Sequence, residues 1–230
     1  MKYNTIEKAT FIKRPNRFIA EVSIGGKTEV VHVKNTGRCK ELLVDNATVY
    51  LEKSSNPLRK TKYDLVGVEK NTDKGSILIN MDSQVPNQIA FEWLPKSGLF
   101  SKKAKIRREV TFGNSRFDLY VEDGERKAFI EVKGVTLEND GIAMFPDAPT
   151  ERGVKHLNEL VSCLEDGYEA YILFVVQMKG VKLFKPNDIT HSAFGDALRN
   201  ADKSGVNVLA YDCIVTEESI EIRNPVNVKL

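Results

Sequence analysis

Cysteine, long apolar runs and net charge are all scarce in this 230-residue sequence. Its three cysteines, Cys39, Cys163 and Cys213, are scattered, and none belongs to a Cys-x-x-Cys pair, which argues against a disulfide framework and a structural zinc site. The longest apolar run, residues 170–176, is far shorter than the roughly 20 residues of a membrane span. No apolar stretch follows a basic start, as it would in a secretory signal. We therefore expect a soluble, cytoplasmic protein with no membrane partner.

The net charge is only +2, so the chain as a whole is no polycation. The basic residues are nevertheless uneven: residues 1–95 hold 15 lysines and arginines against 11 acidic residues, whereas residues 96–230 hold 19 against 21. Just past this boundary, "KSGLFSKKAKIRR" gathers Lys96, Lys102, Lys103, Lys105, Arg107 and Arg108. Such a cluster is either an ordinary solvated surface or a phosphate-binding surface, and a neighbouring site for phosphates would favour the second.

Short alternating segments between residues 11 and 81 predict a small β-barrel. They are "FIKRP", "RFIAEVSI", "TEVVHV", "ATVYLEK", "YDLVGVEK" and "SILIN", with turn residues between them. The stretch "SIGGKT" resembles the end of a phosphate-binding P-loop, but Glu21 stands where its first glycine belongs. It also joins two strand-like runs, so we expect a hairpin turn there.

The run of short alternating segments ends before residue 85. This change predicts a first domain over residues 1–84 and a second over residues 85–230. A helix is expected in "IAFEWLPKSG", ending at its lysine and glycine. The segments that follow alternate between strand and helix patterns and therefore predict a mixed α/β domain. The expected strands are 109–112, 116–121, 128–132, 170–176, 206–211 and 219–222, and the expected helices are 151–165 and 193–203.

Chemically interesting residues concentrate in two of these strands, "SRFDLYV" and "AFIEVKGV". Glu131 and Lys133 are two positions apart, so their side chains point to one face of a strand. The connection "EDGERK" predicts a hairpin that brings Asp118 beside Glu131. Two carboxylates repel unless a cation lies between them, and oxygen ligands favour Mg²⁺ or Mn²⁺. Lys133 can then orient a water or offset charge on a phosphate.

The alternative is that Glu-Val-Lys is an ordinary strand with a weak ion pair. The following helix, "TERGVKHLNELVSCL", favours a site instead. Thr150 is expected as its N-cap, but Gly153 costs about 1 kcal/mol inside a helix, which hints at a close approach by backbone or ligand. Arg152 and Lys155, with His156 nearby, would make the helix N-terminus an anion site. The expected inward stripe is Val154, Leu157, Val161 and Leu164.

Five long motifs resemble the sugar fermentation stimulation protein family over nearly the whole chain: "FIKRPNRFIAEV", "VHVKNTGRCKELL", "SRFDLYV", "FIEVKGVTL" and "FPDAPTERGVKHLNEL". The resemblance implies an N-terminal OB-fold and a C-terminal domain similar to the PD-(D/E)xK nucleases, in a bacterial or archaeal cytoplasm. It also implies DNA binding of low sequence specificity and a regulatory role in sugar metabolism. The nuclease pattern falls on Asp118, Glu131 and Lys133, with Glu109 as an additional acid and metal ligand.

An OB-fold holds single strands through a basic face and stacking aromatics. The candidates for that face are Arg14, Arg17, Lys34, Arg38 and Lys40, with Asn16 and Asn35 as hydrogen-bonding partners. Basic residues on half-exposed strands are also common without any ligand. The stretch "NTGRCKELL" is compatible with a short capped helix as well as a binding loop.

Three functions remain open: a metal-dependent nucleic-acid phosphodiesterase, a DNA-binding regulator that does not cleave, and a carbohydrate-metabolism factor acting through protein partners. The third has least support, because the sequence shows no aromatic-rich sugar site or hydrolase triad. We expect nucleic-acid binding, with DNA as the first candidate and RNA as the alternative. The basic residues Lys102, Lys103, Arg107, Arg152 and Lys155 join the expected binding surface. The sequence leaves the oligomeric state open.

Overall fold

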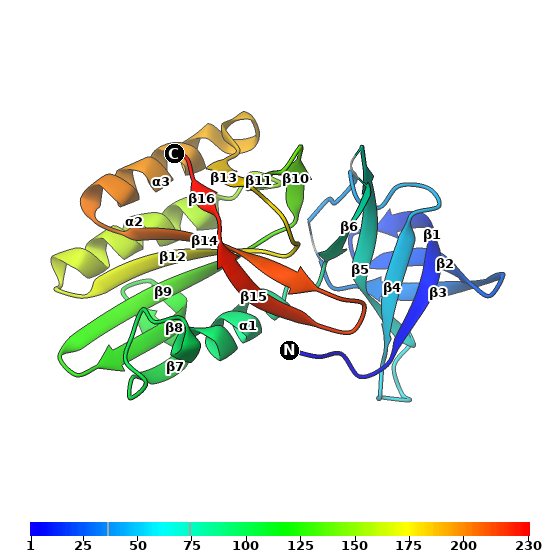
Figure 1. The fold of residues 1–230 in the computed structure, drawn as a ribbon, viewed down its shortest axis with the longest axis horizontal. Helices are drawn as coiled ribbons and strands as arrows, with labels where there is room; N and C mark the ends of the chain where they lie inside the picture. The colour runs from blue at the N-terminus through cyan, green and yellow to red at the C-terminus, as the bar shows by residue number, and fades with distance from the viewer. Residues whose placement is uncertain (36, 74) are drawn as a thin grey trace.

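The computed structural model describes residues 1–35, 37–73 and 75–230. Its first six strands close into a small barrel in the order β3-β2-β1-β4-β5-β6, with an additional parallel pairing of β3 with β5 (Figure 1). The predicted small barrel is confirmed, and each strand-like segment lies in one of its strands. The strands are β1 (Ile6–Asn16), β2 (Ile19–Ile24), β3 (Lys27–Val33), β4 (Thr48–Lys53), β5 (Tyr63–Thr72) and β6 (Gly75–Asn80).

Two connections in the barrel, "SIGGKT" and "NTGRCKELL", could each take more than one conformation on the sequence alone, and both contain turns. Gly25 and Gly26 join β2 to β3 with φ angles of 54° and 82°, which glycine adopts without steric cost. The hairpin predicted for "SIGGKT" is therefore confirmed. In "NTGRCKELL", Thr36 lies outside the described residues, and residues 40–43 form turns rather than a helix. The Leu43 N–H donates to the Cys39 carbonyl at 3.0 Å.

The remaining chain builds a six-stranded mixed sheet in the order β15-β14-β12-β9-β8-β7. Strands β9, β12 and β14 run parallel, and the outer pairings are antiparallel. The buried run of residues 170–176 lies within the central strand β12, as its apolar character predicts. The strands are β7 (Lys105–Phe112), β8 (Ser115–Asp123), β9 (Arg126–Val135), β12 (Glu169–Val176), β14 (Asn207–Val215) and β15 (Ile220–Pro225).

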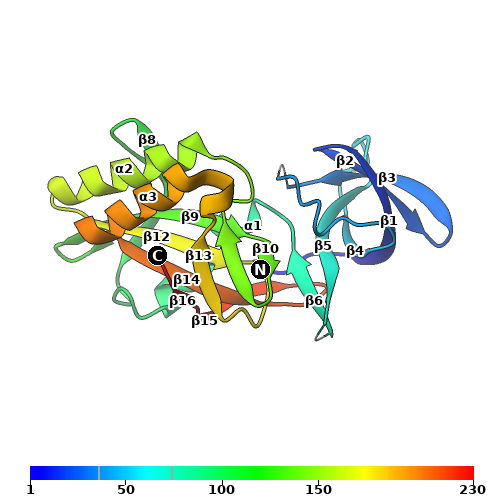
Figure 2. The same cartoon turned by 90° about the horizontal axis from the view of Figure 1, so that it is seen from above.

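Helices α2 (Glu151–Glu165) and α3 (Asp188–Ser204) cover one face of this sheet, and α1 (Val85–Trp93) packs on the other (Figures 1 and 2). The bounds of α2 agree with the prediction. Helix α1 begins earlier than expected and ends at Trp93, where a 3₁₀ turn (η1, Leu94–Lys96) follows. Helix α3 also begins earlier and is kinked at His191. Within the described residues, no helix is long and apolar enough to cross a membrane.

A second, four-stranded sheet was not predicted. Its strands β10 (Leu137–Asn139), β11 (Ile142–Phe145), β13 (Leu183–Pro186) and β16 (Asn227–Val228) pair in the order β10-β11-β13-β16. Each has only two to four residues, which is too short for an alternating pattern to stand out. They form because segments distant in sequence meet beside α3 (Figure 2).

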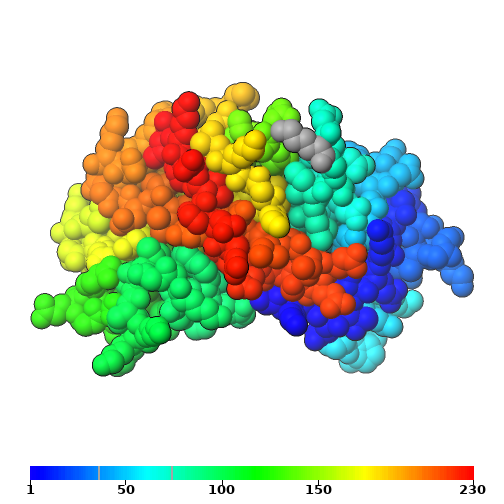
Figure 3. All heavy atoms as spheres, in the orientation of Figure 1, coloured from blue at the N-terminus to red at the C-terminus, as the bar shows by residue number. Residues whose placement is uncertain are grey.

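The barrel and the larger sheet are joined by buried polar contacts. The Asn80 N–H donates to the Gln177 carbonyl at 2.9 Å, and Gln177 Nε2 donates in turn to the carbonyls of Asn80 and Asp82, each at 3.1 Å. The first residues of the chain also lie against the hairpin of β14 and β15, where Lys2 pairs with Ser219 (Figure 3). The two parts therefore hold a defined mutual orientation.

A buried ion pair reinforces this junction. Lys70 Nζ of β5 lies 2.6 Å from Glu138 Oε2 of β10, and only 3% of the surface of Glu138 is exposed. The other Glu138 oxygen accepts from the Gly141 N–H at 2.6 Å. A buried carboxylate of this kind depends on its cation, because an uncompensated charge in the interior is costly.

We predict that Lys70→Met lowers the free energy of unfolding by about 3 kcal/mol, because it leaves Glu138 buried without a counter-charge. The double variant Lys70→Met/Glu138→Gln should lose less than the single one, since it buries no charge. Urea denaturation of both variants measures the difference. A single variant that loses under about 1 kcal/mol would show that Glu138 is solvated in solution.

Candidate functional site

The candidate site lies where β8 and β9 separate. Their register runs from Asp123 and Arg126 to Leu119 and Ile130. At the next residue of β8, Asp118, this backbone pairing stops. The Val132 N–H donates instead to the Asp118 side chain, with 2.8 Å to its Oδ2. β8 therefore carries a carboxylate directly beside the segment of Glu131 and Lys133, at the point where its pairing with β9 stops.

Asp118 is held from both sides. Asn87 of α1 donates its amide to Asp118 Oδ1 at 2.6 Å, opposite the bond from Val132. Burial raises the pKa of Asp118 to about 6, and the negative charge of Glu131 contributes to this rise against the opposing hydrogen bonds. A carboxylate with this pKa is poised to exchange its proton for a cation.

Glu131 is more deeply buried, with 2% of its surface exposed. Its Oε1 accepts from Lys133 Nζ at 2.5 Å and also contacts His156 Nδ1. Burial raises the pKa of Glu131, but the hydrogen bond from His156 and the charge of Lys133 outweigh it, so the pKa lies below its usual range. Glu131 is therefore the ionised carboxylate of the pair.

The second oxygen of Glu131 is what makes the arrangement unusual. Oε2 is buried and has no hydrogen-bond partner among the residues that the structure describes, although an unpaired charged oxygen is costly. A cation bound beside Asp118 would satisfy it. Within residues 1–35, 37–73 and 75–230, no three His, Cys, Asp or Glu side chains gather as a metal cluster. Two carboxylates nevertheless fit Mg²⁺, which keeps several waters and uses few protein ligands.

Sequence reasoning missed the position of His156. It lies 4% exposed on the buried side of α2, whereas the sequence suggested that it joins an anion site. The fully buried residues of that side are Gly153, His156, Leu157, Leu160 and Cys163. The predicted stripe therefore shares only Leu157 with them, and its other three members are half-buried at the edge of the core. The spacing along the helix could have predicted this position. His156 lies four residues before Leu160 and seven before Cys163, and residues at these separations share one face of a helix.

The start of α2 is explained by packing. Thr150 is the N-cap, as predicted, and its hydroxyl accepts from the Gly153 N–H at 3.0 Å. A Cβ on Gly153 would lie 2.9 Å from Thr150 Cγ2 and 3.1 Å from a ring carbon of Phe194 in α3. The close approach at Gly153 is therefore to side chains of the cap and of α3.

Glu109 does not join the two carboxylates in this structure. Its side chain is 61% exposed and pairs with Arg116 at 3.4 Å. The residue has a φ of 57°, an uncommon conformation for a residue other than glycine. Its metal role stays a prediction that the geometry does not support.

The basic residues of α2 lie at its exposed surface. Arg152 Nε donates to His156 Nε2 at 3.3 Å, which links the helix N-terminus to the carboxylate site. Lys155 Nζ donates to the Asn114 carbonyl at 2.7 Å. Of the two, Arg152 therefore has the direct connection to the site.

The basic residues before and within β7 lie farther away. Lys102 and Lys103 form an exposed turn beside the Asp123 end of β8, five residues along the strand from Asp118. Arg107 pairs with Glu122 at 3.1 Å and stacks over Tyr120, with 4.8 Å from its guanidinium carbon to the ring centre. At about 3.3 Å per residue, Asp118 and Asp123 are roughly 16 Å apart along the strand.

Two residues of the predicted basic face serve the barrel itself. Arg14 donates to four backbone carbonyls, of Arg17, Asn35, Gly37 and Arg38, at 2.6 to 2.9 Å. Lys34 is enclosed by three carboxylates, those of Asp82, Glu52 and Asp64, at 3.1 to 3.7 Å. Arg14 therefore holds the loop and Lys34 the domain junction, although Arg14 also lines the groove described next.

Arg17 and Arg38 line a groove of about 510 Å³ at the surface of the barrel. Lys40 and Asn16 also line it, and its far wall is Ala148 and Pro149, just before α2. The groove therefore reaches from the barrel to the residues just before α2, the helix that carries Arg152 and His156.

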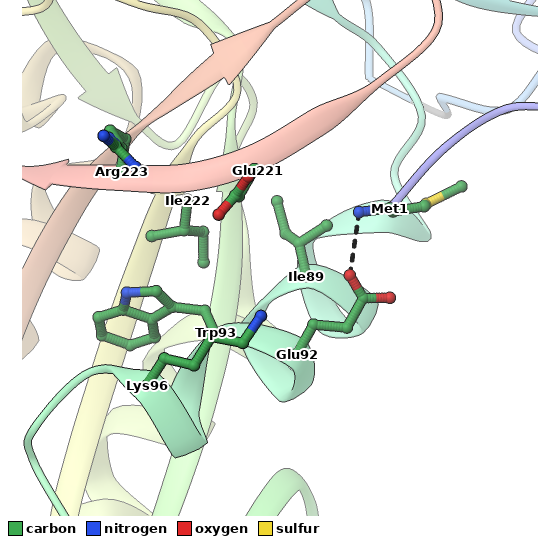
Figure 4. A pocket seen from close by; sticks show the side chains of 8 residues that line it. All are labelled: Met1, Ile89, Glu92, Trp93, Lys96, Glu221, Ile222 and Arg223. Atoms are coloured by element: carbon green, nitrogen blue, oxygen red, sulfur yellow. Dashed lines mark hydrogen bonds and ion pairs between the residues drawn. The ribbon is translucent and has the colours of Figure 1, made fainter.

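A different hollow, of about 450 Å³, lies beside α1 and β15 (Figure 4). The amino group of Met1 points to Glu92 there at 2.9 Å, and the Trp93 indole forms one wall. None of its lining residues belongs to the carboxylate site or the basic groove.

Comparisons with known proteins match the whole chain. A model of the SfsA N-terminal OB domain matches residues 12–80, and a model of the Sugar fermentation stimulation protein RE domain matches residues 84–219. A sugar fermentation stimulation protein homolog from Desulfitobacterium hafniense (strain Y51) is 60% identical over 230 residues, 100% of this chain and 99% of the relative. One from Clostridium beijerinckii is 59% identical, with 100% of both chains covered.

A solved structure also covers the whole fold. The structure of Pyrococcus furiosus SfsA, described as a complex with Ca²⁺, is 27% identical to this chain and superimposes with a TM-score of 0.85. The match covers 100% of this chain and 98% of that one. The predicted architecture, an N-terminal OB domain followed by a mixed-sheet domain with helices, is confirmed.

The raised pKa of Asp118 predicts a pH-dependent effect of Asp118→Asn in metal-free protein. Because burial favours the protonated carboxyl in the folded state, its stabilising contribution is complete below about pH 4 and is lost as the pH rises through about 6. As the pH rises from about 4.5 to 8, the free energy of unfolding of the variant should therefore increase by on the order of 2 kcal/mol relative to that of wild type. Urea denaturation with a chelator present measures this.

Asp123→Asn is the matched control. Hydrogen bonds from Ser101 lower the pKa of Asp123, so this variant should instead lose stability relative to wild type as the pH rises toward about 4, the ordinary pKa of aspartate. A parallel response of the two variants would contradict the assignment of a raised pKa to Asp118.

Proposed function

Because this chain belongs to the sugar fermentation stimulation protein family, we propose that it binds nucleic acid with low sequence specificity and cleaves phosphodiester bonds with a divalent metal. In this proposal, residues 1–84 grip the strand and residues 85–230 form a nuclease-like domain of the PD-(D/E)xK type. The observation that carries the proposal is the buried, unpartnered Oε2 of Glu131 beside the half-buried carboxyl of Asp118.

Asp118 and Glu131 would hold Mg²⁺ or Mn²⁺. The Ca²⁺ complex described for the similar Pyrococcus furiosus protein supports this, because Ca²⁺ is also a hard cation that takes oxygen ligands. When bound, such an ion supplies Lewis acidity and offsets charge on the phosphate. Asn87 and the Val132 N–H keep the Asp118 carboxyl in place.

Lys133 is placed to act on the phosphate or the attacking water. Its ammonium lies 2.5 Å from Glu131 Oε1, with 15% of the side chain exposed. From there it can donate a hydrogen bond to a phosphate oxygen and offset charge in the transition state. Its positive charge also helps to keep Glu131 ionised.

Arg17, Arg38 and Lys40 would bind the strand through its phosphates in the groove that leads to α2. Phosphate contacts position a nucleic acid without reading its bases, which accounts for low sequence specificity. Arg152 would continue this path at the helix N-terminus, where backbone N–H groups also favour anions. Lys102, Lys103, Arg107 and Lys155 would add outer contacts.

The alternative is a DNA-binding regulator of sugar metabolism that does not cleave. One observation favours it: the groove shares no residue with the carboxylate pair, so binding does not require the metal site. The family name links its members to sugar fermentation but does not distinguish the two functions.

We predict that Glu131→Gln and Lys133→Ala each lower metal-dependent cleavage by at least about 100-fold, since each removes a charged group from the reacting centre. Glu131→Gln should also weaken Mn²⁺ binding. Lys133→Ala should retain it, because the loss of a donor to Glu131 Oε1 is offset by the loss of a positive charge beside the cation. Single-turnover assays with labelled single-stranded DNA, duplex DNA and RNA, each with Mg²⁺ and Mn²⁺, provide the measurement.

Glu109→Gln is the control, because this carboxylate is exposed and paired with Arg116. It should leave cleavage within a few-fold of wild type. A wild type that binds DNA but cleaves none of the substrates favours the regulator. Cleavage that persists in both site variants would place the active site elsewhere.

We predict that Arg17→Glu/Arg38→Glu weakens binding to DNAs of different sequence by similar factors. The slope of log affinity against log salt should become shallower by about 0.7 to 0.9 for each phosphate that the variant no longer binds. Lys102→Glu/Lys103→Glu makes the same change in net charge. It should have a smaller effect on affinity, because these residues lie beside Asp123 and do not line the groove. Equal effects of the two doubles would contradict a specific groove; fluorescence anisotropy at several salt concentrations distinguishes them.

A further inference from the structure

We propose that His156 is a positioning residue that orients Glu131 toward the metal, an inference that rests on the proposed metal site. His156 lies on α2, and its Nδ1 contacts Glu131 Oε1 on β9. Both side chains are buried, and the two residues are 4% and 2% exposed. The contact therefore joins two rigid elements away from solvent.

Arg152 determines which nitrogen of His156 carries the proton. An arginine can only donate, so Nε2, which lies 3.3 Å from Arg152 Nε, must accept. Nδ1 then carries the hydrogen and donates a hydrogen bond to Glu131 Oε1. This tautomer follows from the hydrogen-bond network.

The consequence lies at the two oxygens of Glu131. Oε1 takes both donors, Lys133 from the same strand and His156 from the helix, whereas Oε2 takes none and stays buried. Two donors from different directions fix the rotation of the carboxylate. The oxygen left without a partner is thereby the one presented to a cation, as outer hydrogen bonds do for metal ligands generally.

The position of the ring is itself fixed by packing. The edge of Phe117 lies against it, with ring centres 6.1 Å apart. The first turn of α2 is held by the Thr150 cap and by the close fit of Gly153 against Phe194. The packing of α2 as a whole therefore places His156 against Glu131.

The test compares His156→Leu with His156→Asn. The two side chains have similar shapes, but only asparagine keeps a donor near the position of Nδ1. In titrations of the full-length protein with MnCl₂ alone, leucine should weaken Mn²⁺ binding by about 10- to 100-fold, and asparagine should recover most of the affinity. Calorimetry measures binding, and thermal unfolding checks that each variant is folded. His156→Phe serves if the leucine variant does not fold.

The Glu131→Gln background separates positioning from a general structural role. There, His156→Leu should weaken Mn²⁺ binding no further, because the ligand it orients is already altered. A further loss in that background, or equal affinities of the leucine variant and wild type, overturns the inference while the proposed function stands. A wild type that binds no Mn²⁺ overturns both.

Discussion

Two carboxylates, Asp118 and Glu131, lie close together where β8 and β9 separate, and the surrounding structure depends on that proximity. In a low-dielectric interior, adjacent negative charges repel strongly, so each needs donors or a proton. Asp118 receives Asn87 and the Val132 N–H, and Glu131 receives Lys133 and His156. These partners come from α1, α2 and β9. The helices on both faces of the sheet therefore serve one site.

The junction between barrel and sheet extends that site into a surface. Gln177 and the pair of Lys70 with Glu138 keep the barrel against the second domain. This orientation sets Arg17 and Arg38 opposite Pro149, the residue before the cap of α2. A phosphate backbone in the groove would thus approach the helix that carries Arg152. Binding and chemistry are proposed on separate domains, but their geometry depends on one interface.

The basic residues of the predicted face share the same local sequence character but differ in role. Lys34 is enclosed by buried carboxylates, Arg17, Arg38 and Lys40 line the open groove, and Arg14 both donates to backbone carbonyls and lines that groove. Their spacing along the chain does not distinguish them, because the acceptors around Lys34 include Glu52, Asp64 and Asp82, which are distant in sequence. An arginine or lysine becomes a structural cation only when folding brings such acceptors around it.

The sequence by itself determined the barrel strands, the bounds of α2 and the two acids of the site. Alternation predicted all six barrel strands, and the spacing of Glu131 and Lys133 on a strand, with a hairpin back to Asp118, indicated the carboxylate pair. These are local properties, set by the period of a strand and the length of a turn. Only the tertiary structure decided that His156 faces Glu131, that Oε2 is left without a partner and that Glu109 pairs with Arg116. Those contacts depend on how α2 docks and on the positive φ of Glu109 in β7, neither of which follows from the periodicity of the sequence.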